Sequence, residues 1–234
     1  MVCCGQLSRI GNCMNSATQL AQLLCTRLCH DLAGPVGAVA AGVELVGDDP
    51  SMADQETLQL ISASSAAASR KLKFLRIAFG TTAQSSPAAL QDLDATLRNF
   101  FESIAGQSGA VELTWPPTTV LADLQDRAGP ASIQILLNSV LVAIEAAPRA
   151  RRIAVEIAAG DEGAVDTTVV AAGDAGDPVR KDILDAVTDP DGVLSSARNA
   201  QALYWVTMCR EFGWAPTISR DGASLAVAAR FQPV

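Results

Sequence analysis

The residues best suited to chemistry lie side by side in one stretch, where Asp31 follows His30, the only histidine among 234 residues. A neutral imidazole can attack a phosphoryl group directly, because it titrates near neutral pH and keeps one ring nitrogen unprotonated. A neighbouring carboxylate can hold the ring N–H, which fixes the tautomer and leaves the other nitrogen free. His30 is therefore a candidate nucleophile, and Asp31 is a candidate for the residue that orients it.

A regular pattern of apolar residues predicts that His30 lies on a long helix and faces away from its buried side. At about 100° per residue His30 lies roughly 180° from the centre of the apolar face, and Arg27 lies a quarter-turn or more from it. Pro35 should bend this helix about one turn after His30, because proline removes a backbone donor. An exposed histidine without any role is the alternative. The apolar positions are Leu20, Leu24, Leu28, Leu32, Val36, Val39, Val43 and Val46.

Composition indicates a folded chain with few classes of partner. The 49% of hydrophobic residues is enough to bury one large core or two small ones. A formal net charge of −8 would repel a phosphate backbone, so we expect no nucleic-acid partner. No apolar run reaches the length of about 18 residues that a membrane span needs, and Met1 to Gln19 lack an apolar block. We therefore expect no membrane contact, no secretory signal and a cytoplasmic location.

Six cysteines are spaced in a way that does not predict a metal site. They include no C-x-x-C pair and are not accompanied by a matching set of histidines. Two of them stand one helical turn apart beside His30, but a fourth ligand has no obvious source. We expect reduced thiols and no bound metal. The cysteines are Cys3, Cys4, Cys13, Cys25, Cys29 and Cys209.

Start and stop signals predict a helical hairpin over residues 16–80, preceded by a loose extension over residues 1–15. Ser16 and Gln19 have capping-box spacing, so the first helix should run from there to about Val46, before a turn at residues 47–50. The start signal repeats at residues 51–54, and the second helix should end at about Phe79, with Gly80 suited to its cap.

The second helix carries a seam that two helices alone cannot bury. We therefore expect the hairpin to pair with a second copy, giving a homodimer built on a four-helix bundle. Folding at Asp49 brings the level of His30 opposite residues 68–73, which hold Arg70, Lys71 and Lys73. Arg27, Arg70 and Lys73 are candidates for contacts with a phosphate or with an acidic partner surface. The seam positions are Ile61, Ser65, Ala68, Leu72, Leu75 and Phe79.

Residues 81–87 are polar, end in proline and predict a linker to a second domain over residues 88–234. The pattern beyond the linker mixes helical and strand periods, which favours a layered α/β unit with a mixed sheet. The fold class is therefore α plus α/β. The expected helices cover residues 89–105, about 130–144, 179–187 and 198–212, and the expected strands cover residues 111–115, 153–158, 167–171, 217–220 and 224–231.

These motifs resemble a known family. The run from His30 to Pro35 resembles the H-box of dimerising histidine-kinase domains. Together with residues 42–46 and 72–80, it resembles the ChpT-type histidine phosphotransferases of alphaproteobacterial cell-cycle relays. The order of elements in the second domain resembles the ATP-binding domain of histidine kinases. The resemblance implies a dimeric four-helix bundle followed by a degenerate ATPase-like α/β sandwich.

The second domain departs from the kinase pattern where a nucleotide would bind. Asn138 and the stretch from Asp174 to Pro178 resemble remnants of the magnesium-binding and adenine-binding motifs. Residues 194–200, in the place of the phosphate lid, contain no glycine, and close backbone approach to phosphates generally needs one. We therefore expect no ATP and no cofactor in this chain.

The resemblance implies a phosphotransferase that works through phospho-His30. The phosphoryl group would come from the receiver aspartate of a hybrid histidine kinase and pass to the receivers of response regulators. Mg²⁺ would belong to the partner receiver, which has the carboxylates to hold it. Two alternatives stay open at this stage: a divergent sensor histidine kinase that uses ATP, and a non-catalytic dimeric signalling adaptor.

Overall fold

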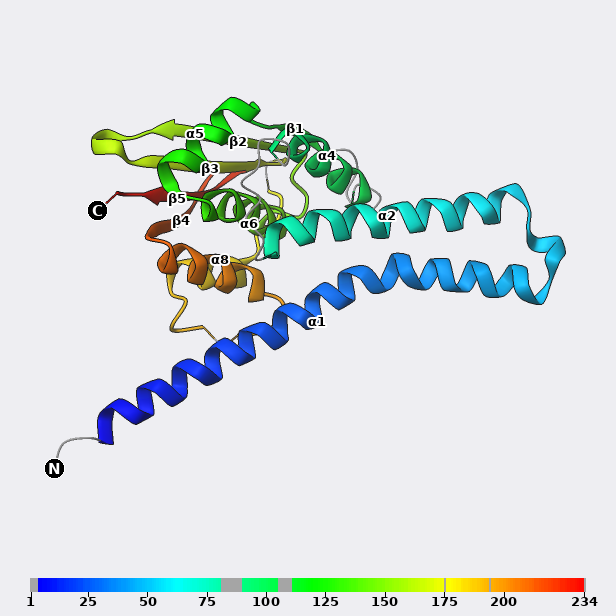
Figure 1. The fold of residues 1–234 in the computed structure, drawn as a ribbon, viewed down its shortest axis with the longest axis horizontal. Coiled ribbons are helices and arrows are strands. Elements are labelled where there is room, and N and C mark those ends of the chain that lie inside the picture. Colours follow the sequence, from blue (N-terminus) through cyan, green and yellow to red (C-terminus); the bar gives the residue numbers. More distant parts are fainter. Residues whose placement is uncertain (1–3, 81–89, 105–110, 175, 194, 234) are drawn as a thin grey trace.

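The computed structural model describes residues 4–80, 90–104, 111–174, 176–193 and 195–233, with side chains from residue 17 onward. Its first part is a long helical hairpin, which projects from an α/β part (Figure 1). The predicted linker at residues 81–87 lies outside the described residues. The predicted fold class, α plus α/β, is confirmed.

The hairpin consists of α1 (Cys4–Asp48), a short 3-10 turn (Pro50–Met52) and α2 (Gln55–Phe79). Asp54 caps α2 by accepting a hydrogen bond from the Thr57 backbone N–H at 2.8 Å, which also lowers the pKa of the Asp54 carboxyl. The predicted C-terminal end of α1 and both predicted ends of α2 are confirmed, whereas α1 begins before the predicted start at Ser16. The predicted loose extension is wrong for residues 4–15, which belong to α1, because no proline or cap signal there interrupts a helix.

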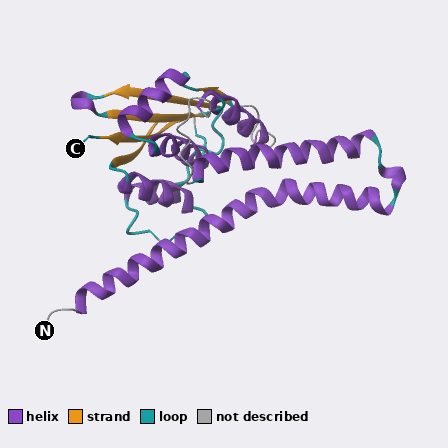
Figure 2. Cartoon of the chain, viewed as in Figure 1, coloured by secondary structure: helices purple, strands orange, loops and turns teal. Residues whose placement is uncertain are grey.

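The α/β part is built on one five-stranded mixed sheet in the order β1-β2-β3-β5-β4, in which only β1 and β2 run parallel. Figure 2 shows these strands in one layer with helices alongside. Helix α6 packs against β3 and β5, and α7 and α8 pack against β4. The elements are α4 (Leu93–Ile104), β1 (Glu112–Thr114), α5 (Thr118–Ala128), α6 (Ala131–Ala146), β2 (Arg152–Ala159), β3 (Val165–Ala172), α7 (Lys181–Thr188), α8 (Ala200–Glu211), β4 (Trp214–Asp221) and β5 (Ser224–Phe231).

Helix α5 is an element that the sequence pattern did not predict. Its buried residues, Leu121, Leu124 and Ala128, recur at helical spacing, and Gly129 follows with a positive φ of 80°. The strand expected over residues 111–115 ends directly before Pro116 and Pro117, which also suit the end of a strand. Proline is equally suited to the start of a helix, where its missing N–H leaves no bond unmade.

Helix α6 is the central core helix of the α/β part, with nearly all of its side chains buried. Within the described ranges no single helix is long and apolar enough to cross a bilayer. Only α5 and α6 taken together have the length and composition for it, and this pair is bent by 117°.

The hairpin rests on the α/β part through both of its helices. Leu20 and Leu28 of α1 pack against the core of that part, and α1 contacts α8. Near the end of α2 the ring of Phe74, which is fully buried, stacks on Phe100 of α4 with centroids 4.1 Å apart. The predicted apolar stripe of α1 is therefore divided, because its first half covers the α/β part instead of forming a bundle seam.

Helices α1 and α2 approach each other closely at Gly42, which leaves room for Ile61. A Cβ added to Gly42 would lie 2.5 Å from Cγ1 of Ile61, whereas a Cβ added to Gly37 would meet nothing within 4 Å. Both glycines are inside α1. They form a matched pair of sites that differ only in the space around them.

We expect Gly42→Ala to lower the free energy of unfolding by about 1–2 kcal/mol, because the close helix contact must open. Gly37→Ala should instead raise it by about 0.5–1 kcal/mol through higher helix propensity. Urea or thermal unfolding of the two variants measures both effects. A stabilising effect of equal size at both positions would contradict the tight contact at Ile61.

Candidate functional site

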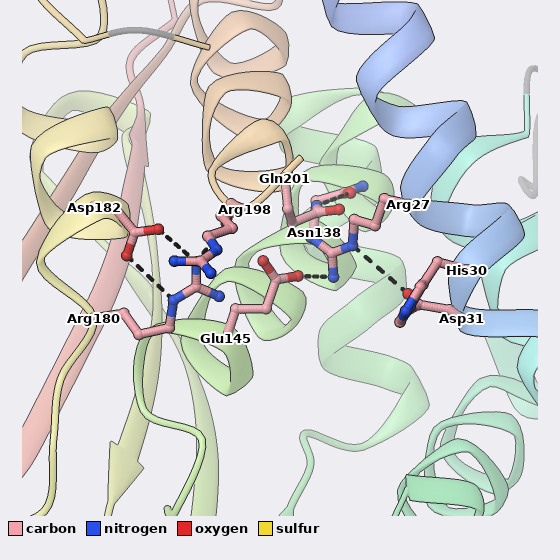
Figure 3. Close-up of polar contacts among 9 residues, drawn as sticks. All are labelled: Arg27, His30, Asp31, Asn138, Glu145, Arg180, Asp182, Arg198 and Gln201. Carbon is pink, nitrogen blue, oxygen red and sulfur yellow. Dashed lines mark hydrogen bonds and ion pairs between the residues drawn. The ribbon is translucent and has the colours of Figure 1, made fainter. Parts of the chain in front are cut away.

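His30 stands on the outer surface of α1, with 90% of its side chain exposed. Its Nδ1 lies 3.9 Å from Oδ1 of Asp31, too far for a hydrogen bond but close enough for an electrostatic interaction (Figure 3). The expected exposure of His30 on the face opposite the buried stripe agrees with this geometry. Nε2, the nitrogen remote from the carboxylate, is then the atom available to a partner.

Asp31 is held by groups from both helices of the hairpin. Its Oδ2 lies 3.7 Å from Nε of Arg27, one turn earlier in α1. Its backbone carbonyl accepts a hydrogen bond of 3.3 Å from Nζ of Lys71 in α2. This contact places Lys71 at the level of His30, as the predicted folding of the hairpin requires. Helix α1 continues through Pro35 and changes direction along its length (Figure 1).

Arg27 joins α1 to the α/β part. Its guanidinium pairs with the carboxylate of Glu145 in α6, and the side chains are only 17% and 13% exposed (Figure 3). Burial lowers the pKa of Arg27 from its ordinary value, and the charge of Asp31 opposes that shift. An arginine remains charged in such a site, so both carboxylates compete for one cation. Arg27 is thus committed to protein groups and does not stand free for a phosphate.

The other two predicted contacts, Arg70 and Lys73, point to a different neighbour. Arg70 pairs with Glu102 of α4 at 3.2 Å, and Lys73 lies 4.0 Å from Asp92. Neither contact leads toward His30. The structure therefore favours Lys71 over Arg70 and Lys73 as the basic residue beside the imidazole.

Sequence reasoning overlooked the residues of α6 that meet the hairpin. Gln134, Asn138 and Glu145 share one face of this otherwise apolar helix, and Glu145 is its only charged residue. That polar stripe was the available signal, because a buried polar side chain requires a partner. Gln134 donates a hydrogen bond to the carbonyl of Gly80, at the end of α2.

Asn138 is fully buried, and its side-chain amide is engaged on both sides. Its Nδ2 donates to the carbonyls of Ala78 and Gln134, both at 2.8 Å, and its Oδ1 accepts from Nε2 of Gln201 at 2.7 Å. A magnesium ligand would need a free oxygen directed at solvent or phosphate. The asparagine that resembles a magnesium ligand is therefore part of the joint between α6 and α2.

The loop that resembles an adenine-binding motif is also closed on itself. Oδ2 of Asp177 accepts a hydrogen bond from the backbone N–H of Asp174 at 2.8 Å. Arg149 and Arg151 lie 4.0 Å and 3.7 Å from the carboxylates of Asp177 and Asp174. Like the buried Asn138, the carboxylates of Asp174 and Asp177 are therefore engaged by groups of the protein itself.

The described cysteines are free thiols in two environments. Cys25 and Cys29 are exposed on α1, and Cys209 is buried in α8, where burial raises the pKa of its thiol to about 12. Cys3, Cys4 and Cys13 lie outside the side chains that the structure describes. Among those that it does describe, no three His, Cys, Asp or Glu residues are grouped so as to hold a metal ion.

Known proteins are similar to this chain in sequence and in fold. A family model for the histidine phosphotransferase C-terminal domain matches residues 90–224. The protein phosphotransferase ChpT of Brucella abortus (strain 2308) is 34% identical over 149 residues, which cover 62% of this chain and 64% of that protein. A bacterial phosphotransferase solved at 1.7 Å has a TM-score of 0.66 at 25% identity, covering 91% of this chain and 96% of that one.

Fold and site together define a two-part protein, in which a helical hairpin displays an imidazole beside a carboxylate and an α/β domain holds the hairpin. The family model matches more than half of the chain, and the chain therefore belongs to the histidine phosphotransferase family. The resemblance to ChpT-type proteins is thereby confirmed. The chain spans just under two thirds of the length of the Brucella protein that it matches.

We expect Asn138→Leu to lower the free energy of unfolding by about 2–4 kcal/mol, because the Ala78 carbonyl and the Gln201 amide both lose a buried partner. Gln125→Leu is the matched control, since the buried Nε2 of Gln125 has no hydrogen-bond partner. That control should change stability by less than about 1 kcal/mol. Chemical denaturation compares the two, and equal losses would contradict a structural role for Asn138.

Proposed function

We propose that the chain relays a phosphoryl group through His30, from the receiver aspartate of a hybrid histidine kinase to the receivers of response regulators. The observation that carries this proposal is an exposed imidazole with a carboxylate on one side and an open nitrogen on the other. Membership in the histidine phosphotransferase family supports the same chemistry. A phosphoryl carrier needs both exposure and a group that stabilises the charged ring.

In the proposed step, Nε2 of His30 attacks the phosphorus of an aspartyl phosphate in line with the leaving oxygen. A P–N bond forms, the P–O bond to the receiver breaks, and the receiver carboxylate leaves with the electron pair. The ring then carries positive charge, which Asp31 stabilises or relieves by accepting the Nδ1 proton. In the return step, the carboxylate of a second receiver attacks the phosphorus, and the imidazole leaves.

The proposal assigns the chain no cofactor of its own and leaves Mg²⁺ to the partner receiver. The buried Asn138 disfavours the sensor-kinase alternative, because its amide oxygen is already bonded to Gln201. The exposed His30 and its neighbouring acid disfavour the adaptor alternative, because a purely structural protein has no need of that pair.

The test follows labelled phosphate from a purified, phosphorylated receiver to this chain in the absence of nucleotide. Wild type should take up the label and pass it to a second receiver. His30→Gln should take up none, because an amide is no nucleophile for this reaction, and Cys29→Ala should behave as wild type. Labelling of wild type by Mg-ATP alone would favour a kinase, and a wild type that takes no label from the receiver would favour an adaptor.

We also propose that the hairpin completes a four-helix bundle with a second copy of the chain. Val36 and Val43 of α1 lie seven residues apart and are 55% and 57% exposed. Leu58 and Leu72 of α2 lie fourteen residues apart and are 53% and 56% exposed. Apolar residues at heptad spacing on two antiparallel helices are typical of a bundle seam, and their exposure in one chain leaves that seam open.

A double variant with Val43→Glu and Leu58→Glu should raise the dimer dissociation constant by at least about 100-fold, because both charges would be buried without partners. Ala41→Glu is the control, since Ala41 lies three turns after His30 on its exposed face. Light scattering after gel filtration measures the mass. A wild type with the mass of one chain, or an intact dimer in the double variant, would contradict this bundle.

A further inference from the structure

A continuous row of charged groups leads from the α/β domain to the imidazole. Glu145 of α6 pairs with Arg27 of α1, Nε of Arg27 lies 3.7 Å from Oδ2 of Asp31, and Oδ1 of Asp31 lies 3.9 Å from Nδ1 of His30 (Figure 3). All four residues line a cavity of about 560 Å³ between the hairpin and the α/β domain. Among the described residues, no other part of that domain is linked to Asp31 by ion pairs.

We propose that Glu145 is a positioning residue that keeps Asp31 available to His30 by holding Arg27 away from it. This inference rests on the proposed function of His30. Two carboxylates compete for one guanidinium, and the contact with Glu145 is the closer of the two. Asp31 is left with the longer of the two ion pairs, 3.7 Å from Nε of Arg27 and beyond hydrogen-bond length, so its carboxylate can still turn to the ring.

The burial of the pair explains why this competition has consequences. Glu145 and Arg27 are 13% and 17% exposed, whereas the Asp31 side chain is 40% exposed. Charges that water screens poorly interact strongly, so the buried carboxylate holds the cation more firmly than the exposed one does. If Glu145 lost its charge, Asp31 would be the remaining anionic partner of Arg27, and a close pair between them would weaken Asp31 as a proton acceptor.

Other charged groups near this row do not replace Glu145. Lys71 donates a hydrogen bond to the backbone carbonyl of Asp31 and not to its carboxylate. Arg180 is close enough to Arg27 to disfavour its charge, and it is itself paired with Asp182. The α/β domain would thus influence the reaction through one carboxylate on its core helix.

Glu145→Gln tests the inference, because glutamine keeps the shape of the side chain and removes its charge. We expect the transfer rate at saturating receiver to fall about tenfold, with the half-saturating receiver concentration unchanged. In a chain that already carries Asp31→Asn, Glu145→Gln should change the rate by less than about twofold, because it acts through the missing carboxylate. Equal losses in both backgrounds would show a merely structural role and overturn the inference.

Glu102→Gln is the matched control. Glu102 also pairs with an arginine of the hairpin, Arg70, but this ion pair is not part of the row that leads to Asp31. It should leave the rate at saturating receiver unchanged. The ring ¹⁵N shifts of His30, the only histidine, give a second readout that needs no turnover. Glu145→Gln should move the Nδ1 resonance, and Glu102→Gln should not.

An Nδ1 resonance that is the same in wild type and in Glu145→Gln would overturn the inference, as would an unchanged transfer rate. A wild type that accepts no phosphoryl group would overturn the proposed function instead. That result is distinct, because it precedes any comparison between variants.

Discussion

The structure depends on polar side chains of the core helix α6 that bond to the hairpin. Asn138 donates to the carbonyl of Ala78 at 2.8 Å, Gln134 donates to the carbonyl of Gly80, and Glu145 pairs with Arg27. Leaving such a group unpaired costs about 1–3 kcal/mol, and more for a charge. Separating the hairpin from the α/β domain would therefore deprive several polar groups of their partners at once. These contacts fix the orientation of the hairpin.

This fixed orientation gives the α/β domain a structural role in the proposed relay. Asn138 keeps the residue type of a magnesium ligand, but its amide holds two helices together. In the proposed relay the α/β domain supplies no phosphate. It holds α1 so that His30 faces solvent, and Glu145 restrains the cation beside Asp31. The same core helix thus provides stability and sets the charge environment of the reacting ring.

Local sequence signals predicted the hairpin and most of the strands, but they did not predict the contacts between residues far apart in the chain. Asp54 and Gly80 mark the ends of α2 in the sequence as well as in the structure. The exposure of His30 followed from helical periodicity alone. The partner of Arg27 did not, because Glu145 is 118 residues away in the chain, and only the packed fold brings the two together. Helix α5 was overlooked because Pro116 and Pro117, which directly precede it, suit the end of a strand as well as the start of a helix.

The most direct test of the account identifies the atom that carries the phosphoryl group. After incubation with a phosphorylated receiver and no nucleotide, ¹⁵N and ³¹P NMR can observe the one imidazole of the chain without overlap. The account predicts a phosphoramidate at Nε2 of His30, the nitrogen remote from Asp31. Phosphate on Nδ1, on another residue, or on His30 only when Mg-ATP is added would contradict it.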